Sequence, residues 1–137
     1  MPAPYTGHCF CGQVSYSIAA DPVGARMCWC RDCQYIASGS ATVNVLFPDD
    51  AVTFSGEITV IEKIADSGNT MHRGFCPVCG SQMYSRTVQP PGAPIRIRAG
   101  TLDDTELMPP QSVIWTSSAP AWAVFDPALP AFPKAPG

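Results

Sequence analysis

The sequence predicts a mostly β protein that is organised around cysteine-containing turns and has one short helix. Fifteen prolines in 137 residues disfavour long helices, because an interior proline removes a hydrogen bond and clashes with the preceding turn. Several short segments alternate apolar and polar residues, which is the period of a half-buried strand. Seven cysteines occur in closely spaced groups. A chain of this length is expected to form a single domain, residues 1–137.

The expected strands follow one another along the chain and are separated by turns. In the first of them, Val14, Tyr16 and Ile18 alternate strictly with polar residues. Pro48 ends a second segment whose apolar residues share one face, and Ile95–Arg98 alternates again. The complete set of expected strands is 13–18, 41–47, 57–64, 70–75, 82–86, 95–98 and 112–116.

One helix is expected, over residues 33–38. Asp32 is a good capping residue at its start, and Gly39 stands where helices commonly end. This position would place Cys33 at the positive end of the helix, which favours its thiolate form. The last segment, 126–137, contains four prolines and little charge, so we expect an extended tail over the surface.

The turn Cys76-Pro77-Val78-Cys79 is the central metal-binding feature of the sequence. A Cys-x-x-Cys turn can direct two sulfurs at one zinc ion, at about 2.3 Å each. Cys9 and Cys11 offer a second pair of sulfurs in a tight turn flanked by glycines. The sequence therefore predicts a zinc held by Cys9, Cys11, Cys76 and Cys79, which would join the start of the chain to its middle.

Composition excludes several classes of partner. The net charge is −3 and the eight basic residues form no cluster in the sequence, which argues against a nucleic-acid surface or an anionic membrane. No apolar run is long enough to span a membrane, and the N-terminus does not resemble a signal peptide. A cytoplasmic protein is the expectation. In that reducing compartment, clustered cysteines are metal ligands rather than disulfides.

Motifs along nearly the whole chain resemble one family, the glutathione-dependent formaldehyde-activating family, whose domain also occurs in centromere protein V. The residues that support this resemblance are Gly7-His8-Cys9-Phe10-Cys11-Gly12, Cys28-Trp29-Cys30-Arg31-Asp32-Cys33, Ala37-Ser38-Gly39, Arg73-Gly74-Phe75-Cys76-Pro77-Val78-Cys79-Gly80-Ser81, Gly100-Thr101-Leu102-Asp103-Asp104, Ile114-Trp115 and Leu129-Pro130. The resemblance implies an Mss4-like complex β fold with two zinc sites. It places Cys9, Cys11, Cys76 and Cys79 at the structural site and Cys28, Cys30 and Cys33 at a three-thiolate catalytic site. Trp29, Arg31 and Val113 depart from the residues common in relatives.

The chemistry of a three-cysteine site supports this implication. Three thiolates and one Zn²⁺ sum to −1 and leave a fourth tetrahedral position open, as in catalytic sites. Such a zinc ion is better suited to binding an incoming thiol as its thiolate than to generating hydroxide from water. We therefore expect a carbon–sulfur lyase-type enzyme, similar to S-(hydroxymethyl)glutathione synthase, that forms or cleaves an adduct between a glutathione-like thiol and a formaldehyde-like aldehyde. The second zinc is expected to be the more labile one.

Two residues beside these cysteines are candidates for binding the thiol. Trp29, between two expected ligands, could form a pocket wall, and Arg31 could contact a substrate carboxylate or lie solvated on the surface. His8 and His72 lie near cysteines, but four sulfurs already satisfy the structural zinc, so neither is expected to be a ligand.

Two other functions remain open from the sequence. A zinc-stabilised binding module without catalysis is one alternative, because a fold does not determine a function. Methionine sulfoxide reduction occurs on a related zinc-containing β fold but requires a nucleophilic cysteine outside the zinc turns, and no cysteine follows Cys79.

Overall fold

The fold consists of two β-sheets and one short helix, and the computed structural model describes residues 3–135. The smaller sheet has the strand order β1-β2-β5, formed by Tyr5–His8, Ser15–Ile18 and Val52–Ser55. The larger sheet has the order β10-β3-β4-β9-β8-β7-β6. Its strands are β3 (Gly24–Cys28), β4 (Thr42–Phe47), β6 (Thr59–Ile64), β7 (Thr70–Phe75), β8 (Gln82–Gln89), β9 (Ile95–Arg98) and β10 (Val113–Ile114). The prediction of a mostly β protein with one short helix is confirmed.

The strand boundaries differ from the expected ones for local reasons. β2 begins at Ser15 because residues 9–14 form a turn closed by the hydrogen bond from Cys9 N to Val14 O. β10 ends at Ile114 because Trp115 has a left-handed backbone conformation, with φ of 58°. The sequence does not predict β1, β3 or β5. β1 and β5 lie on either side of β2 and depend on pairing with it, and β3 depends on pairing with β4 and β10.

The helix α1 spans Arg31–Ile36 and begins two residues before the expected start. Its N-cap is Cys30, whose sulfur accepts a hydrogen bond from Cys33 N at 3.3 Å. The expectation that Asp32 caps the helix is therefore wrong, as is the placement of Cys33 at its first position. Asp32 lies in the first turn and contacts Lys63 of β6 and Arg73 of β7. These contacts connect α1 to the far side of the larger sheet.

The larger sheet has one apolar face, which forms the main core. Val45 of β4 lies directly opposite Ile97 of β9, and each is at most 1% exposed. They belong to the same buried cluster as Tyr16 and Ile18 of the smaller sheet. Burial of this apolar surface between the two sheets is the dominant stabilising contribution.

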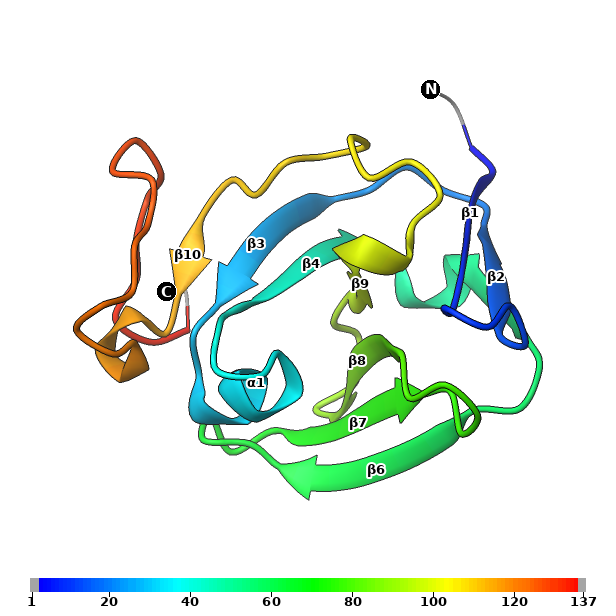
Figure 1. Cartoon of the computed structure of the whole chain (residues 1–137), viewed down its shortest axis with the longest axis horizontal. Helices are drawn as coiled ribbons and strands as arrows, with labels where there is room; N and C mark the ends of the chain where they lie inside the picture. Colours follow the sequence, from blue (N-terminus) through cyan, green and yellow to red (C-terminus); the bar gives the residue numbers. More distant parts are fainter. Residues whose placement is uncertain (1–2, 136–137) are drawn as a thin grey trace.

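The opposite face of the larger sheet is polar and turned inward. Arg26, Asn44 and Arg98 form a row across β3, β4 and β9, since each is the register partner of the next. The sheet curls so that β3 and β4 form one side and β7 and β6 the other, with β9 and β8 between them (Figure 1). This curvature encloses the polar face instead of leaving it in solvent.

The C-terminal segment lies along the edge of the larger sheet. β10 is parallel to β3, and Val113 N donates to Pro130 O at 2.9 Å on the other side. The described part of the expected tail therefore pairs with β10, while residues 1, 2, 136 and 137 of the predicted domain lie outside the described residues. Among residues 3–135, no helix is long and apolar enough to span a membrane.

Candidate functional site

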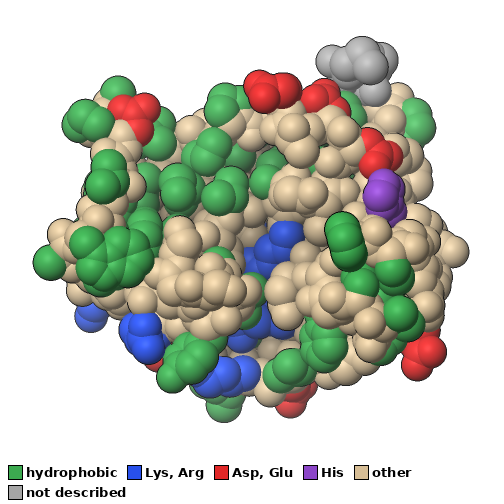
Figure 2. Space-filling view, in the orientation of Figure 1, with side chains coloured by type: hydrophobic (Ala, Val, Ile, Leu, Met, Phe, Trp, Pro, Cys, Tyr) green, Lys and Arg blue, Asp and Glu red, His purple; other side chains and the backbone are tan. Residues whose placement is uncertain are grey.

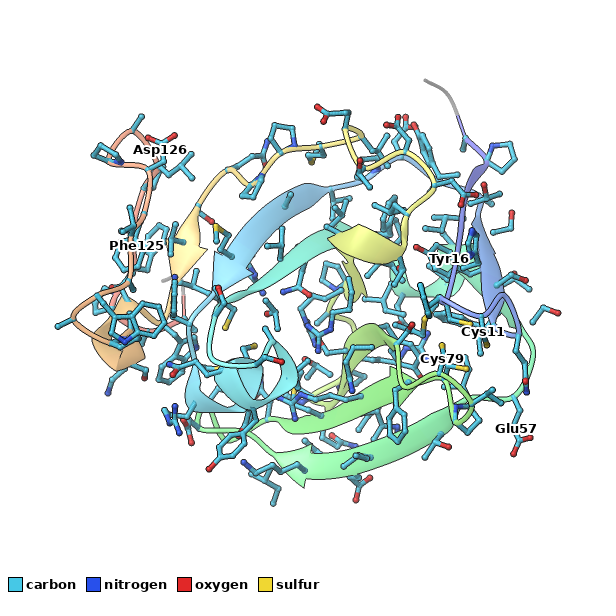
Figure 3. All side chains as sticks on the ribbon, in the orientation of Figure 1. Cys11, Tyr16, Glu57, Cys79, Phe125 and Asp126 are labelled. Carbon is cyan, nitrogen blue, oxygen red and sulfur yellow. The ribbon has the colours of Figure 1, made fainter. Side chains whose placement is uncertain are left out.

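Four cysteines from distant parts of the chain meet between the two sheets. Cys9 and Cys11 lie in the turn after β1, and Cys76 and Cys79 lie in the turn between β7 and β8. The sulfur of Cys11 is 3.6 Å from that of Cys9 and 3.8 Å from that of Cys76, and Figure 3 shows Cys11 and Cys79 next to each other. Four thiolates around a tetrahedral zinc with bonds of about 2.3 Å have sulfurs about 3.8 Å apart. The donor set and its spacing fit zinc.

Backbone and side-chain donors hold these sulfurs in place. Val14 N donates to the Cys9 sulfur at 3.2 Å, and Cys79 N lies 3.5 Å from the Cys76 sulfur. Hydrogen bonds from Ser81 lower the pKa of Cys79 to about 5. Cys9 and Cys76 are fully buried, whereas Cys11 is exposed. Because the four sulfurs fill every position of a tetrahedral zinc, the cluster has the closed ligand set of a structural site.

The other three cysteines form a second cluster where β3 meets α1. Cys28 is the last residue of β3, Cys30 caps α1 and Cys33 lies within α1. Their sulfurs all lie within 4.8 Å of one another. Three sulfurs provide one ligand fewer than a tetrahedral zinc accepts, and all three residues line a cavity of about 130 Å³. The cluster therefore has a position open toward a space that a ligand can enter.

A chain of hydrogen bonds connects this cluster to a buried arginine. The Thr42 hydroxyl donates to the Cys33 sulfur at 3.1 Å, and Asn44 Nδ2 donates to the Thr42 oxygen at 3.0 Å. Arg98 Nη1 in turn donates to Asn44 Oδ1 at 2.6 Å. The pKa of Cys33 is lowered, first by hydrogen bonds from the neighbouring thiols and then by the Thr42 hydroxyl and the Arg98 charge. Such outer hydrogen bonds orient a metal ligand and adjust its electron density.

Four of the eight basic residues line the cavity next to the three-cysteine cluster. They are Arg26 of β3, Arg73 of β7, and Arg96 and Arg98 of β9. Figure 2 shows Lys and Arg side chains in the centre of the molecule, below the surrounding surface. Burial lowers the pKa of Arg96 to about 10, so this arginine remains protonated at neutral pH. The cavity is therefore positively charged, although the chain as a whole is acidic.

The two residues predicted to bind the thiol do not line this cavity. The Trp29 ring is 3% exposed and packs against Trp122 and Phe125. Arg31 is exposed, donates to Gln34 at 2.6 Å and stacks over the Tyr35 ring at 5.2 Å.

The two histidines lie outside both clusters of sulfurs. His8 contacts Asp103 at 3.4 Å, and His72 contacts Glu62 at 2.8 Å. Neither belongs to a group of potential ligands among the described residues.

A comparison with known families agrees with this geometry. Residues 4–118 match the family described as glutathione-dependent formaldehyde-activating enzyme. The chain belongs to this family. The match includes all seven cysteines and the four arginines of the cavity. No curated protein matches the chain in a sequence search.

The arginine cluster is the feature that sequence reasoning does not find. The alternation in Ile95–Arg98 indicates that Arg96 and Arg98 share one face of a strand, and this is observed. A half-buried strand would leave that face in solvent, whereas all four residues of β9 are buried. The sequence contains the pattern but not the curvature of the sheet that encloses it.

Proposed function

We propose that this protein is a zinc-dependent carbon–sulfur lyase that forms or cleaves an adduct between a thiol and a small aldehyde at Cys28, Cys30 and Cys33. The observation that supports this proposal best is the position of the three sulfurs, which lie together on the wall of a cavity and leave one ligand position open. The membership in the formaldehyde-activating family agrees with it. A zinc ion held there would keep an incoming thiol ionised beside the cavity.

The residues of the chain contribute position and charge to this reaction. In the forward direction, the thiol gives up its proton and its sulfur attacks the aldehyde carbon. The carbon–sulfur bond forms as the π bond of the carbonyl group breaks, and the resulting oxyanion takes up a proton from water to become a hydroxyl. The reverse reaction breaks the carbon–sulfur bond and releases both reactants. The cavity keeps the two reactants next to each other, which is the main source of acceleration for a bimolecular addition. The buried guanidinium groups stabilise negative charge on the reactants or on the developing oxyanion.

The two cysteine clusters would have different roles. The closed cluster of Cys9, Cys11, Cys76 and Cys79 would bind a structural zinc, because it joins segments 65 residues apart and has all four ligands. The three-cysteine cluster would bind the more labile zinc. A set of seven metal-binding thiols is most compatible with a reducing compartment, which supports a cytoplasmic location.

The experiment measures adduct exchange directly. Two-dimensional exchange NMR on a mixture of glutathione and formaldehyde gives the rate of adduct formation with and without zinc-loaded protein. We expect the protein to increase this rate and Cys30→Ser to remove the increase, because Cys30 is part of the open cluster. The matched control is Thr53→Val, since Thr53 is exposed on β5 and belongs to neither cluster.

One result would favour the alternative function. If the zinc-loaded protein binds thiols but leaves the exchange rate unchanged, it is a thiol-binding module and not an enzyme. If it binds no thiol, the proposed reaction at this cluster is wrong.

A further inference from the structure

The cavity beside the three-cysteine cluster contains more positive charge than its protein surroundings neutralise. Its four guanidinium groups contribute +4, and no Asp or Glu among the described residues lines it. Asp32 contacts Arg73 at 3.5 Å from the side of α1 and contributes −1. A zinc with three thiolates contributes a further −1. About two positive charges therefore remain, and buried charge of this kind is costly unless a partner compensates it.

Two of these arginines have donors that no described residue uses. Arg98 is 7% exposed, and its Nε and Nη2 atoms are buried without a hydrogen-bond partner within residues 3–135. Arg73 is 9% exposed, and its Nε atom is also buried without a hydrogen-bond partner among the described residues. Buried donors are almost always paired in folded proteins. Three orphaned donors on two arginines that line one cavity therefore indicate that an acceptor from outside the chain binds there.

Arg96 serves as an internal comparison, because it lines the same cavity but is satisfied by the protein. Its Nε donates to the Ser85 hydroxyl at 2.8 Å, and its Nη2 donates to the Thr87 hydroxyl at 2.9 Å. Its Nη1 donates to Pro94 O at 3.2 Å. Arg96 therefore contributes charge and support, whereas Arg73 and Arg98 have donors available for a ligand.

We propose that Arg73 and Arg98 bind the carboxylate of a small acidic reactant whose reacting atom lies at the three-cysteine cluster. This inference deepens the proposed function, because it specifies one of the two reactants as an acid, and its reaction part rests on that function. A planar guanidinium matches a carboxylate, which can accept two parallel hydrogen bonds. The carboxylate belongs either to the thiol, as in mercaptoacetate, or to the aldehyde, as in glyoxylate.

The size of the cavity limits the acid. A volume of about 130 Å³ is comparable with the ~150 Å³ engineered cavity that holds benzene, so a ligand of roughly six non-hydrogen atoms fits. Mercaptoacetate and glyoxylate are within this size. A tripeptide such as glutathione is larger, so most of it would remain outside. The enclosed part of the site thus selects for a small acid.

The test compares matched pairs of ligands that differ only in charge. Isothermal titration calorimetry of zinc-loaded protein near neutral pH gives dissociation constants for mercaptoacetate and 2-mercaptoethanol, and for glyoxylate and glycolaldehyde. In at least one pair, the acid is expected to bind roughly tenfold or more tightly than its neutral counterpart, since charge-assisted hydrogen bonds contribute at this level. The pair with the larger ratio identifies whether the thiol or the aldehyde is the acid.

Arginine variants connect the preference to this cavity. Arg98→Gln and Arg73→Gln are each expected to remove most of the preference for the acid. The hydrogen bond of Arg73 to Asp32 is long, at 3.5 Å, whereas that of Arg98 to Asn44 is 2.6 Å, so the Arg73 variant remains informative if Arg98→Gln does not fold. The control is Arg86→Gln, because Arg86 lies on β8 outside the cavity and pairs with Asp49 at 2.5 Å. It is expected to retain the preference.

Three results would overturn the inference. The first is that the acid and the neutral ligand bind equally in both pairs. The second is that the preference for the acid is unchanged in both Arg73→Gln and Arg98→Gln. The third is that inorganic phosphate binds as tightly as both acids do. Failure of the proposed function has a different outcome. In that case 2-mercaptoethanol does not bind the zinc-loaded protein, while mercaptoacetate or glyoxylate still binds in a manner that depends on Arg73 and Arg98.

Discussion

The hydroxyl of Thr42 is expected to control the affinity of the three-cysteine cluster for zinc. Thr42→Val keeps the shape of the side chain and removes the donor that lies 3.1 Å from the Cys33 sulfur. Loss of a hydrogen bond to a metal ligand typically lowers metal affinity by about 10–100-fold. The same change deprives Asn44 Nδ2 of its acceptor at 3.0 Å, and Asn44 is only 2% exposed. The free energy of unfolding should therefore fall by about 1–3 kcal/mol.

Competition with a chromogenic chelator measures the zinc affinity, and thermal melts of the zinc-loaded protein measure stability. Thr42→Ser restores the hydroxyl and should retain most of the wild-type affinity. Thr53→Val is the matched control, because Thr53 is exposed on β5, far from the cluster in the fold. The hydrogen bonds from Arg98 through Asn44 and Thr42 are expected to support zinc binding by the cluster. This expectation would be refuted if Thr42→Val bound zinc with a dissociation constant within about twofold of the wild-type value.

Purified protein should contain between one and two zinc ions per chain by elemental analysis, and folded, reduced protein without zinc would contradict the assignment of both clusters. Cys76→Ser should unfold or aggregate the protein, whereas Cys30→Ser should leave the fold largely intact; equal melting temperatures of the two variants would contradict the division of roles. Gly74→Ala should lower the free energy of unfolding by about 1–3 kcal/mol, because its Cβ would lie 2.2 Å from the Tyr84 ring. Gly100→Ala, with no atom within 4 Å of the added carbon, is the control in urea denaturation, and an equal loss in both variants would contradict the steric argument.

Local patterns in the sequence predict most of the strands and the pairing of the metal-binding turns. The segments 70–75 and 82–86 flank a Cys-x-x-Cys turn, and the structure has a β7–β8 hairpin with this turn at its tip. Cys9 and Cys11 meet Cys76 and Cys79, as the spacing predicts. The hairpin and each of the two turns depend on residues within a few positions of one another, so propensity and periodicity are sufficient to find them. The pairing of the two turns, which lie 65 positions apart, is predicted because a zinc ion needs four ligands and each turn offers two sulfurs.

The cap of α1 could not be predicted from propensity alone. Asp32 is a common capping residue, but the Cys30 sulfur accepts the hydrogen bond from Cys33 N instead. Asp32 is drawn into contacts with Lys63 and Arg73, which are more than thirty positions away in the sequence. A long-range ion pair thus overrides a local preference.

The sequence by itself determined the mostly β class, the two groups of cysteines and the alternation in Ile95–Arg98, because each depends on short-range spacing. Only the tertiary structure decided that Arg26, Arg73, Arg96 and Arg98 come together beside Cys33. Alternation specifies which residues share a face of a strand, but it contains no information on whether that face is open to solvent. Here the larger sheet curls on itself and encloses its polar face, so four arginines that are separate in the sequence line one buried cavity.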